Sequence, residues 1–554
     1  MRSATLTESL ALSETSRIID DERRRVRLRA RRTSLRRAAV LVVIVVALLV
    51  VWQLAADLAL TRLGVAASPL SIVRSIVDDA GLYLNATAVT GWVAVRGWVI
   101  GNAVAILVAV LFVQIPALES LFLRLALVLF CLPLVAVNPI LQLTFPADTA
   151  RVVLTALSVF FTTLVGAILG LRSADGGPLT MVRAWGGSGV AGLRFVRLPS
   201  SIPAVMTGLQ VGAAAAVLGA IFGEFIGATR GIGVLLINGL MGLQLDRIWS
   251  IAVIATIMAA VPYALFGYLR DRLAPWGASI STAAPAAGRR ASRGATRVLR
   301  PLAWAAGSVV IVLAAWWAYL AAFDVSSFVG KSPTDVLAYL TSVDDAGENR
   351  AAIAGALGTT LLHGGIGYIA GLTVGVTAAV LFVQFPVVER IVTPVAVAFR
   401  TVPIIVIIPV LILALGRGLG AVVAITAIVT FFPTLANTQS GLARVPIDGI
   451  NLMRSYDASR WTTLWRLQLP YTLPAIFASA RIAVPSALLA ATLAEWLATG
   501  DGLGHYIVGS RAESDYAGLW AGAAVLTVVS LIAYSVVSLV ERRVLSTYSP
   551  THVS

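Results

Sequence analysis

The chain has 554 residues, of which 58% are hydrophobic and 12% charged, and its formal net charge is +15. Soluble globular domains are about 45–50% apolar and about 25% charged. The composition therefore excludes a soluble enzyme, a nucleic-acid-binding module and a disordered protein as descriptions of most of the chain. Long apolar runs that could span a bilayer recur throughout, which predicts an all-α polytopic membrane protein.

Basic residues are concentrated in two stretches. Residues 1–37 contain eleven arginines just ahead of the first apolar run, and further arginines follow Tyr268. Basic segments beside membrane-spanning helices stay in the cytoplasm, because moving them across the bilayer costs free energy. We therefore expect both stretches to be cytoplasmic, and the length of the first argues against a cleavable signal. The single cysteine, Cys131, excludes a disulfide framework.

The apolar runs predict about twelve membrane spans in two sets of about six. The expected spans are 38–60, 87–113, 120–143, 150–171, 203–228 and 248–269, then 301–322, 356–384, 391–415, 418–440, 474–498 and 516–540. The predicted domains are a basic arm 1–37, a first repeat 38–271, a flexible linker 272–300, a second repeat 301–543 and a tail 544–554. An even number of spans in each repeat places both termini in the cytoplasm.

The two halves of the sequence repeat one another. Phe112–Glu119 recurs as Phe382–Glu389 at an offset of 270 in the numbering, and Leu198–Ala204 recurs as Leu469–Ala475 at an offset of 271. Because both copies are expected to begin on the same side of the membrane, they are parallel repeats related by an axis along the membrane normal. Such an axis predicts a shared pathway between the halves.

Each half contains one long polar interruption between its fourth and fifth expected spans. These segments, 181–199 and 453–470, carry a short amphipathic stretch that ends in Leu-Pro. We expect Pro199 and Pro470 to lie in the first turn of the following helix and to set the angle at which the chain re-enters the membrane. A short helix on the cytoplasmic face would offer a partner protein a surface to bind.

The polar segments resemble those of a known family. In the permease subunits of bacterial ABC importers of the nitrate, sulfonate and taurine type, this segment reads approximately Arg-Ser-Leu-Gly-Ala-Ser, followed by Leu-Pro-x-x-x-Pro. The second half has Arg454–Ser459 and Leu469–Pro474, and the first half has Arg183–Gly186 and Leu198–Pro203. The resemblance covers nearly all of both halves, and it implies that two permease subunits are fused in one chain.

The two halves depart from the family pattern in different ways. Asp457 stands where the family has a loop glycine, which the first half keeps as Gly186. Phe130 replaces the basic residue that the second half has as Arg400. The two halves therefore need not bind a partner with equal affinity.

The resemblance implies partners that this chain does not contain. It implies two cytoplasmic ATPase subunits, which bind ATP and Mg, and an extracytoplasmic solute-binding protein. Gly330-Lys331-Ser332 lacks the preceding glycine of a phosphate-binding loop, because Val325 occupies that position, so ATP hydrolysis belongs on another polypeptide. We expect no catalytic residue, cofactor or metal on this chain. The residues expected to couple it to the ATPase are Arg183, Trp185, Gly186, Pro199, Arg454, Asp457, Trp461 and Pro470.

Several polar residues and one proline are candidates for the pathway or a gate. Glu224 and Glu495 are related by the same offset of 271, and ionisable groups at membrane depth are costly unless they are paired or hydrated. The interpretation we favour is a buried hydrogen bond that organises the glycine-rich turn after each glutamate. Contact with the pathway or a gate is the alternative. Arg96, which can also snorkel or pair with a carboxylate, His363 and Pro403 complete the set.

The resemblance therefore implies a fused permease of an ATP-driven importer in the bacterial plasma (inner) membrane. It also implies a small solute, such as a sulfonate, nitrate, taurine or a heterocycle. The main alternative is a secondary transporter that has two parallel six-span repeats and is driven by an ion gradient. The sequence does not contain the cluster of reactive residues that a membrane enzyme would need. A non-transporting scaffold that has lost its ATPase is a further alternative.

Overall fold

The computed structural model describes residues 67–115, 134–174, 176–276, 296–385 and 403–548, most of 43–60, and residues 118, 128, 131, 132 and 387–389. The chain divides into two compact units, Met1–Ser75 and Ile76–Ser554. In the first unit, a helical segment ends in the π-turn η1 (Ala56–Leu60), and the Leu70 amide donates to the side chain of Gln53. The basic arm, most of the linker, Pro133, Phe130 and Arg400 lie outside the described residues.

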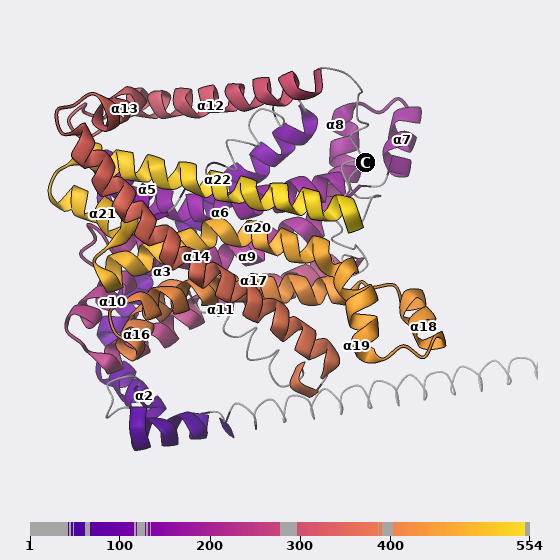
Figure 1. The fold of residues 1–554 in the computed structure, drawn as a ribbon, viewed down its shortest axis with the longest axis horizontal. Helices are drawn as coiled ribbons and strands as arrows, with labels where there is room; N and C mark the ends of the chain where they lie inside the picture. Colours follow the sequence, from indigo (N-terminus) through magenta and orange to yellow (C-terminus); the bar gives the residue numbers. More distant parts are fainter. Residues whose placement is uncertain are drawn as a thin grey trace, which may run out of the picture. The chain divides into compact units, whose positions relative to one another are not determined.

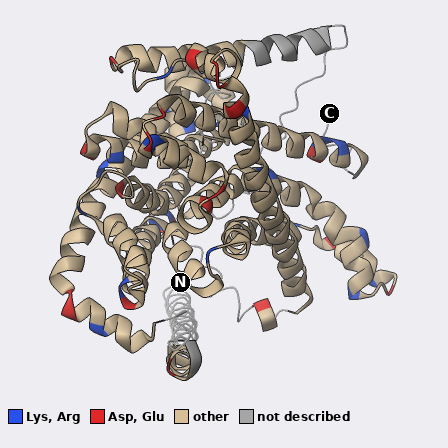
Figure 2. Ribbon diagram, turned by 60° about the vertical axis from the view of Figure 1, so that its left-hand side comes forward, with Lys and Arg blue, Asp and Glu red and all other residues tan. Residues whose placement is uncertain are grey.

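The described residues are helical and contain no strand, and the expected all-α membrane fold is confirmed. After α2 (Pro69–Asp78), the first half contains α3 (Ala80–Gln114), α5 (Leu134–Thr144), α6 (Ala147–Arg172), α7 (Gly176–Ala184), α8 (Gly189–Gly192), η2 (Leu193–Arg197), α9 (Leu198–Glu224), α10 (Ile232–Met241) and α11 (Leu245–Leu273). The second half contains α12 (Thr296–Ala322), α13 (Pro333–Thr341), α14 (Ala346–Gln384), α16 (Ile404–Leu415), α17 (Leu419–Ala443), α18 (Ile447–Ser455), α19 (Arg460–Thr463), η4 (Leu464–Gln468), α20 (Leu469–Ala494), η5 (Glu495–Thr499), α21 (Gly502–Ala512) and α22 (Tyr516–Tyr548). Long stretches of these helices carry no charged residue (Figure 2).

Eight of the expected spans are long apolar helices within the described residues. The first and third spans of each half are represented by shorter apolar helices, of which α5 and α16 are the third spans. The fifth spans begin earlier than expected, because continuous helices run over Gly189–Glu224 and Arg460–Thr499. The short apolar helix α10 was not expected.

Small residues set the packing of the long helices in the same way in both halves. A Cβ atom on Gly101 of α3 would lie 2.5 Å from the carbonyl oxygen of Ala156 on α6, and a Cβ on Gly371 of α14 would lie 2.5 Å from that of Ala427 on α17. Glycine is required at such close backbone approaches, as is common between membrane helices. The repeat in sequence is therefore also a repeat in helix packing.

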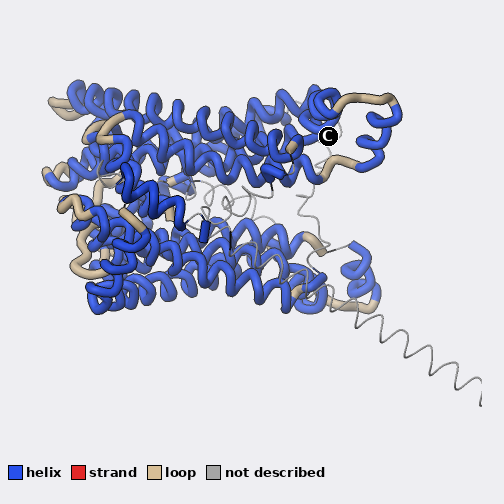
Figure 3. The backbone as a smooth tube through the Cα atoms, turned by 90° about the horizontal axis from the view of Figure 1, so that it is seen from below, coloured by secondary structure: helices blue, strands red, loops and turns tan. Residues whose placement is uncertain are grey.

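The third helix of each half packs on the other half. Helix α5 contacts α20, α21 and α22, whereas α16 contacts α9 and α11. The Tyr319 hydroxyl lies 2.7 Å from Thr144 Oγ1, and the rings of Phe145 and Phe323 lie 4.8 Å apart. A buried apolar cluster with members from both halves lies between them. This reciprocal exchange indicates a pseudo-twofold relation between the halves, whose helices are shown in Figure 3.

The connecting segments gather at two opposite ends of the second unit. The short helices α7, α8, α18 and α19 lie at one end, and α10, α13 and α21 lie at the other (Figure 1). Helices α9 and α20 run between these ends, so each links one short polar segment to one glycine-rich turn.

Candidate functional site

The polar segments form two turns with the same backbone conformation. We refer to residues 181–187 and 452–458 as the matched turns. Gly186 has φ +78° and Asp457 has φ +51°, so both occupy the left-handed region that glycine tolerates best. The Gly187 amide donates to the Val182 carbonyl at 2.8 Å, and the Ala458 amide donates to the Met453 carbonyl at 3.0 Å. The aspartate therefore keeps the turn that the glycine makes in the first half.

A serine begins the helix after each matched turn. The Ser188 side chain accepts a hydrogen bond from the Ala191 amide, and the Ser459 side chain accepts one from the Thr462 amide at 3.1 Å. These are N-caps, which satisfy amides that the first helical turn leaves free. In each half they fix the point at which the chain turns back toward the long helix.

Pro199 and Pro470 are the second residues of α9 and α20, in the first turn as expected. Neither proline, however, starts a separate helix, because the π-turns η2 and η4 precede them without a break. A proline lacks an amide hydrogen and its ring crowds the preceding turn. The amides of Leu198 and Leu469 instead donate to the carbonyls of Leu193 and Leu464, in the π-helical pattern. The wider turn accommodates the proline, and the matched turn continues into the membrane helix.

The matched turns expose large side chains at equivalent positions. Trp185 is 81% exposed, and Tyr456, its equivalent in the second half, is 79% exposed. Arg183 and Arg454 are also exposed, as is Trp461. The sequence pattern pointed to Trp461 and not to Tyr456. The signal was present, because the offset of 271 between the repeats pairs Trp185 with Tyr456.

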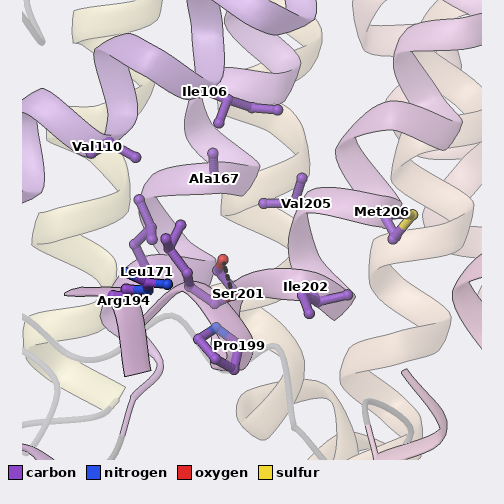
Figure 4. A pocket seen from close by; sticks show the side chains of 11 residues that line it. Ile106, Val110, Ala167, Leu171, Arg194, Pro199, Ser201, Ile202, Val205 and Met206 are labelled. Carbon is purple, nitrogen blue, oxygen red and sulfur yellow. Dashed lines mark hydrogen bonds between the residues drawn. The ribbon is translucent and has the colours of Figure 1, made fainter. Parts of the chain in front are cut away.

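An apolar cavity of about 340 Å³ lies beside Pro199 in the first half. Figure 4 shows Ile106 and Val110 of α3, Ala167 of α6 and Val205 of α9 along its wall, with Arg194 at its edge. It lies within the helices of the first half, at the end of α9 that joins the matched turn.

Glu224 is the centre of a buried hydrogen-bond group at the other end of α9. Its carboxylate accepts from the Thr90 hydroxyl at 2.8 Å and from the Gly233 amide at 2.8 Å. Thr90 in turn accepts from the Ile232 amide at 2.9 Å. Gly231 has φ +129°, and a Cβ there would overlap the carboxylate. We call this group the first anchor, since it joins α3, α9 and the start of α10.

The second half builds the same group from the equivalent residues. The carboxylate of Glu495 accepts from the Thr360 hydroxyl at 2.8 Å and from the Gly504 amide at 3.2 Å. Thr360 accepts from the Leu503 amide at 2.8 Å. His363 Nδ1 lies 3.6 Å from the carboxylate, which is beyond hydrogen-bond reach. This second anchor joins α14, η5 and α21, and both anchors favour the turn-organising interpretation of the glutamates.

Of the remaining candidates, Arg96 lies within α3 and Pro403 lies at the start of α16. The guanidinium of Arg96 lies 5.4 Å from the ring centre of Trp92, one turn away on α3, and Trp92 is exposed. Pro403 is buried and is the N-cap residue of α16, where it fixes the entry of the chain. The structure therefore brings His363 to the second anchor and leaves Arg96 half-buried on its helix beside a tryptophan, with its Nε buried.

Comparison with known proteins identifies the family. The family described as "Binding-protein-dependent transport system inner membrane component" matches residues 101–276 and 371–546, which together are more than half of the chain. A relative, the formylaminopyrimidine transport permease protein of Halalkalibacterium halodurans, is 31% identical over 185 residues, 33% of this chain and 74% of the relative. The putative aliphatic sulfonates transport permease protein of Escherichia coli is 29% identical over 227 residues, 40% of this chain and 83% of the relative.

A third relative, the taurine transport system permease protein of Escherichia coli, is 30% identical over 146 residues, 26% of this chain and 53% of the relative. These relatives are named as permeases rather than enzymes. The chain is a multi-pass membrane protein that belongs to the binding-protein-dependent transport system inner membrane component family and carries two copies of its domain.

Proposed function

We propose that this single chain supplies both membrane halves of an ATP-driven importer. It moves a small solute, such as a sulfonate, nitrate, taurine or a heterocycle, into the cytoplasm. The observation that carries the proposal is the pair of matched turns, which repeat one backbone conformation and one set of exposed side chains in the two halves. A chain that presents the same surface twice is suited to two ATPase subunits, which bind ATP and Mg.

The matched turns are the surfaces that contact the ATPase subunits. Each carries an exposed aromatic ring, Trp185 or Tyr456, and an exposed guanidinium, Arg183 or Arg454. Aromatic and arginine side chains are the usual energetic centres of protein interfaces. This end is the cytoplasmic one in the proposal, because α11 begins next to α10 at the other end and finishes with Arg270 and Arg272, and basic residues beside membrane-spanning helices stay in the cytoplasm. The solute-binding protein docks at the opposite end.

Continuous helices carry motion away from the matched turns. The helix Gly189–Glu224 has 36 residues, which corresponds to a length of about 54 Å at the rise of an α-helix. It begins just after the first matched turn and ends at the carboxylate of the first anchor. A displacement of the matched turn by an ATPase therefore reaches the far end of the membrane domain and rocks the two halves.

The test is a double substitution, Trp185→Ala with Tyr456→Ala. The native tagged chain is purified from its own cells, and the ATPase that co-purifies with it is identified and titrated against each variant. Loss of one central aromatic side chain from an interface costs at least about 2 kcal/mol, so we expect affinity to fall by about 30-fold or more. Membrane insertion and yield stay unchanged.

Phe328→Ala is the matched control. Phe328 is 66% exposed, comparable to the two target residues, but it lies between α12 and α13 at the opposite end of the second unit. We expect this variant to bind the ATPase as the native chain does. Native affinity in the double variant, or the absence of any ATPase from the native complex, contradicts the proposal.

A further inference from the structure

The residue after each anchor glutamate carries an aromatic ring, and the two rings meet. Phe225 follows Glu224 and Trp496 follows Glu495. Their ring centres lie 5.9 Å apart with an interplanar angle of 55°. Phe225 is buried, and the ring of Phe222 also lies 5.9 Å from it. The contact between Phe225 and Trp496 joins the two halves, at the ends of the helices that begin at the matched turns.

Phe225 and Trp496 are also equivalent residues of the two repeats. They are related by the offset of 271 that relates Glu224 to Glu495. The twofold operation that exchanges the halves therefore exchanges these two rings. Two groups that exchange under a twofold rotation and also touch must lie on either side of the axis. Each ring centre is thus within about half of the 5.9 Å separation from the pseudo-twofold axis.

A pathway shared by parallel repeats follows that axis. Paired aromatic rings on it occupy the space that a solute would need, and an apolar constriction also excludes water and ions. We propose that Phe225 and Trp496 form a gate that closes the pathway at the end away from the matched turns. The gate rests on the proposed function only for the direction of transport, since its position follows from the repeat and the ring contact.

The anchors explain why the rings hold their positions. Glu224 is fixed to Thr90 and Gly233 of its own half, and Glu495 is fixed to Thr360 and Gly504 of its own half. Each ring is covalently next to an anchored residue and moves with its half. The gate therefore opens when the halves separate at this end, without any rearrangement inside either half.

The first test measures ion leakage, which requires no knowledge of the solute. The purified chain is reconstituted into liposomes loaded with potassium chloride, and the release of K⁺ is followed. We expect Phe225→Ala with Trp496→Ala to leak at least about ten times faster than the native chain, because small side chains leave the axis open. The exchanged pair, Phe225→Trp with Trp496→Phe, keeps one large and one smaller ring at the axis and is expected to stay sealed.

The second test keeps the proposal open to refutation if the alanine pair folds poorly. In a Cys131→Ala background, Phe225→Cys with Trp496→Cys is expected to leak when reduced and to be sealed by a short thiol-bridging reagent. Phe145→Cys with Phe323→Cys is the off-axis control, since those rings also touch across the halves but are not equivalent residues. It is expected to stay sealed in both states.

A folded alanine pair that leaks no faster than the native chain overturns the gate, as does a cysteine pair whose leak is unaffected by bridging. Neither measurement uses an ATPase. A failure of the gate is therefore distinguishable from a failure of the proposed function, which would show as the absence of ATPase binding.

Discussion

The anchors give a quantitative prediction for the turn between α9 and α10. Thr90→Val removes a hydroxyl and keeps the shape of the side chain. In the native chain this hydroxyl donates to Glu224 at 2.8 Å and accepts from the Ile232 amide at 2.9 Å, and Thr90 is fully buried. A hydroxyl has one hydrogen to donate and two lone pairs to accept with, so it can make both bonds at once. The substitution therefore leaves one buried amide without a partner.

The expected cost is the sum of two losses. A buried amide without a partner costs about 1–3 kcal/mol, and the lost hydrogen bond to the carboxylate contributes about 1.5–3 kcal/mol more. Opening of the turn should become about 2.5–6 kcal/mol easier, which corresponds to an opening population about 70- to 25,000-fold larger. The Gly233 amide keeps its bond to Glu224 and limits the change to this turn.

Hydrogen–deuterium exchange in peptides that cover residues 226–236 measures this opening. Thr90→Ser is the matched control, because it retains the hydroxyl and loses only a methyl group, and its exchange should stay within about fivefold of native. Thr360→Val should produce the same effect at Leu503 and Gly504 and leave the first half unchanged. Equal exchange in Thr90→Val and Thr90→Ser, or a uniform increase along all helices, refutes the reasoning.

Four further outcomes follow from the structure. Gly504→Ala should sharply reduce the yield of monodisperse protein, because the added Cβ would overlap a backbone carbonyl. Gly509→Ala on the same helix is the control: its Cβ would enter open space, and the substitution should raise the unfolding temperature slightly. Gly186→Ala should weaken ATPase binding by straining its turn by about 1–2 kcal/mol, while Asp457→Gly should bind at least as well as the native chain. The pKa of Asp335 is held below its usual range because the backbone amide that precedes helix α13 donates to its carboxylate. Asp335→Asn should therefore lower the unfolding temperature at neutral pH. The difference from the native chain should shrink as the pH falls below the ordinary aspartate pKa of about 4. Uptake should be lost on ATP depletion and persist in the presence of an uncoupler, and the reverse result would favour an ion-driven transporter.

Much of the site followed from the sequence because duplication marks equivalent positions. The offset of 271 pairs the two glutamates from the sequence alone, and their place in apolar runs indicates a hydrogen-bonded role. The partners Thr90 and Thr360 were not identified. They lie in the middle of long apolar runs, and a lone threonine there resembles any other helix residue. The repeat could have revealed them as a pair, since their offset of 270 is also that of Phe112 and Phe382.

Features that depend on packing between distant segments were not available from the sequence. The exchange of α5 and α16 between the halves leaves no local trace, because an apolar helix has the same pattern whichever half it contacts. The continuous helices through Pro199 and Pro470 were also missed. Proline ordinarily marks a helix start or a kink, and only the backbone hydrogen bonds reveal that a π-turn accommodates it.

The third helices bridge the two halves. Helix α16 packs on α9 and α11 of the first half and also on α17 of its own half, and α5 packs on α20, α21 and α22 of the second half and also on α6 of its own. Each half contains one anchor and one gate ring, and a continuous helix connects that ring to the matched turn of the same half. The contact between Phe225 and Trp496 therefore lies between the halves, while the connection from each ring to its matched turn lies within one half. In the proposed mechanism, a displacement of the matched turns reaches the ring contact through these helices. The buried hydrogen bonds of the anchors persist during that motion, because the partners of each glutamate lie in its own half.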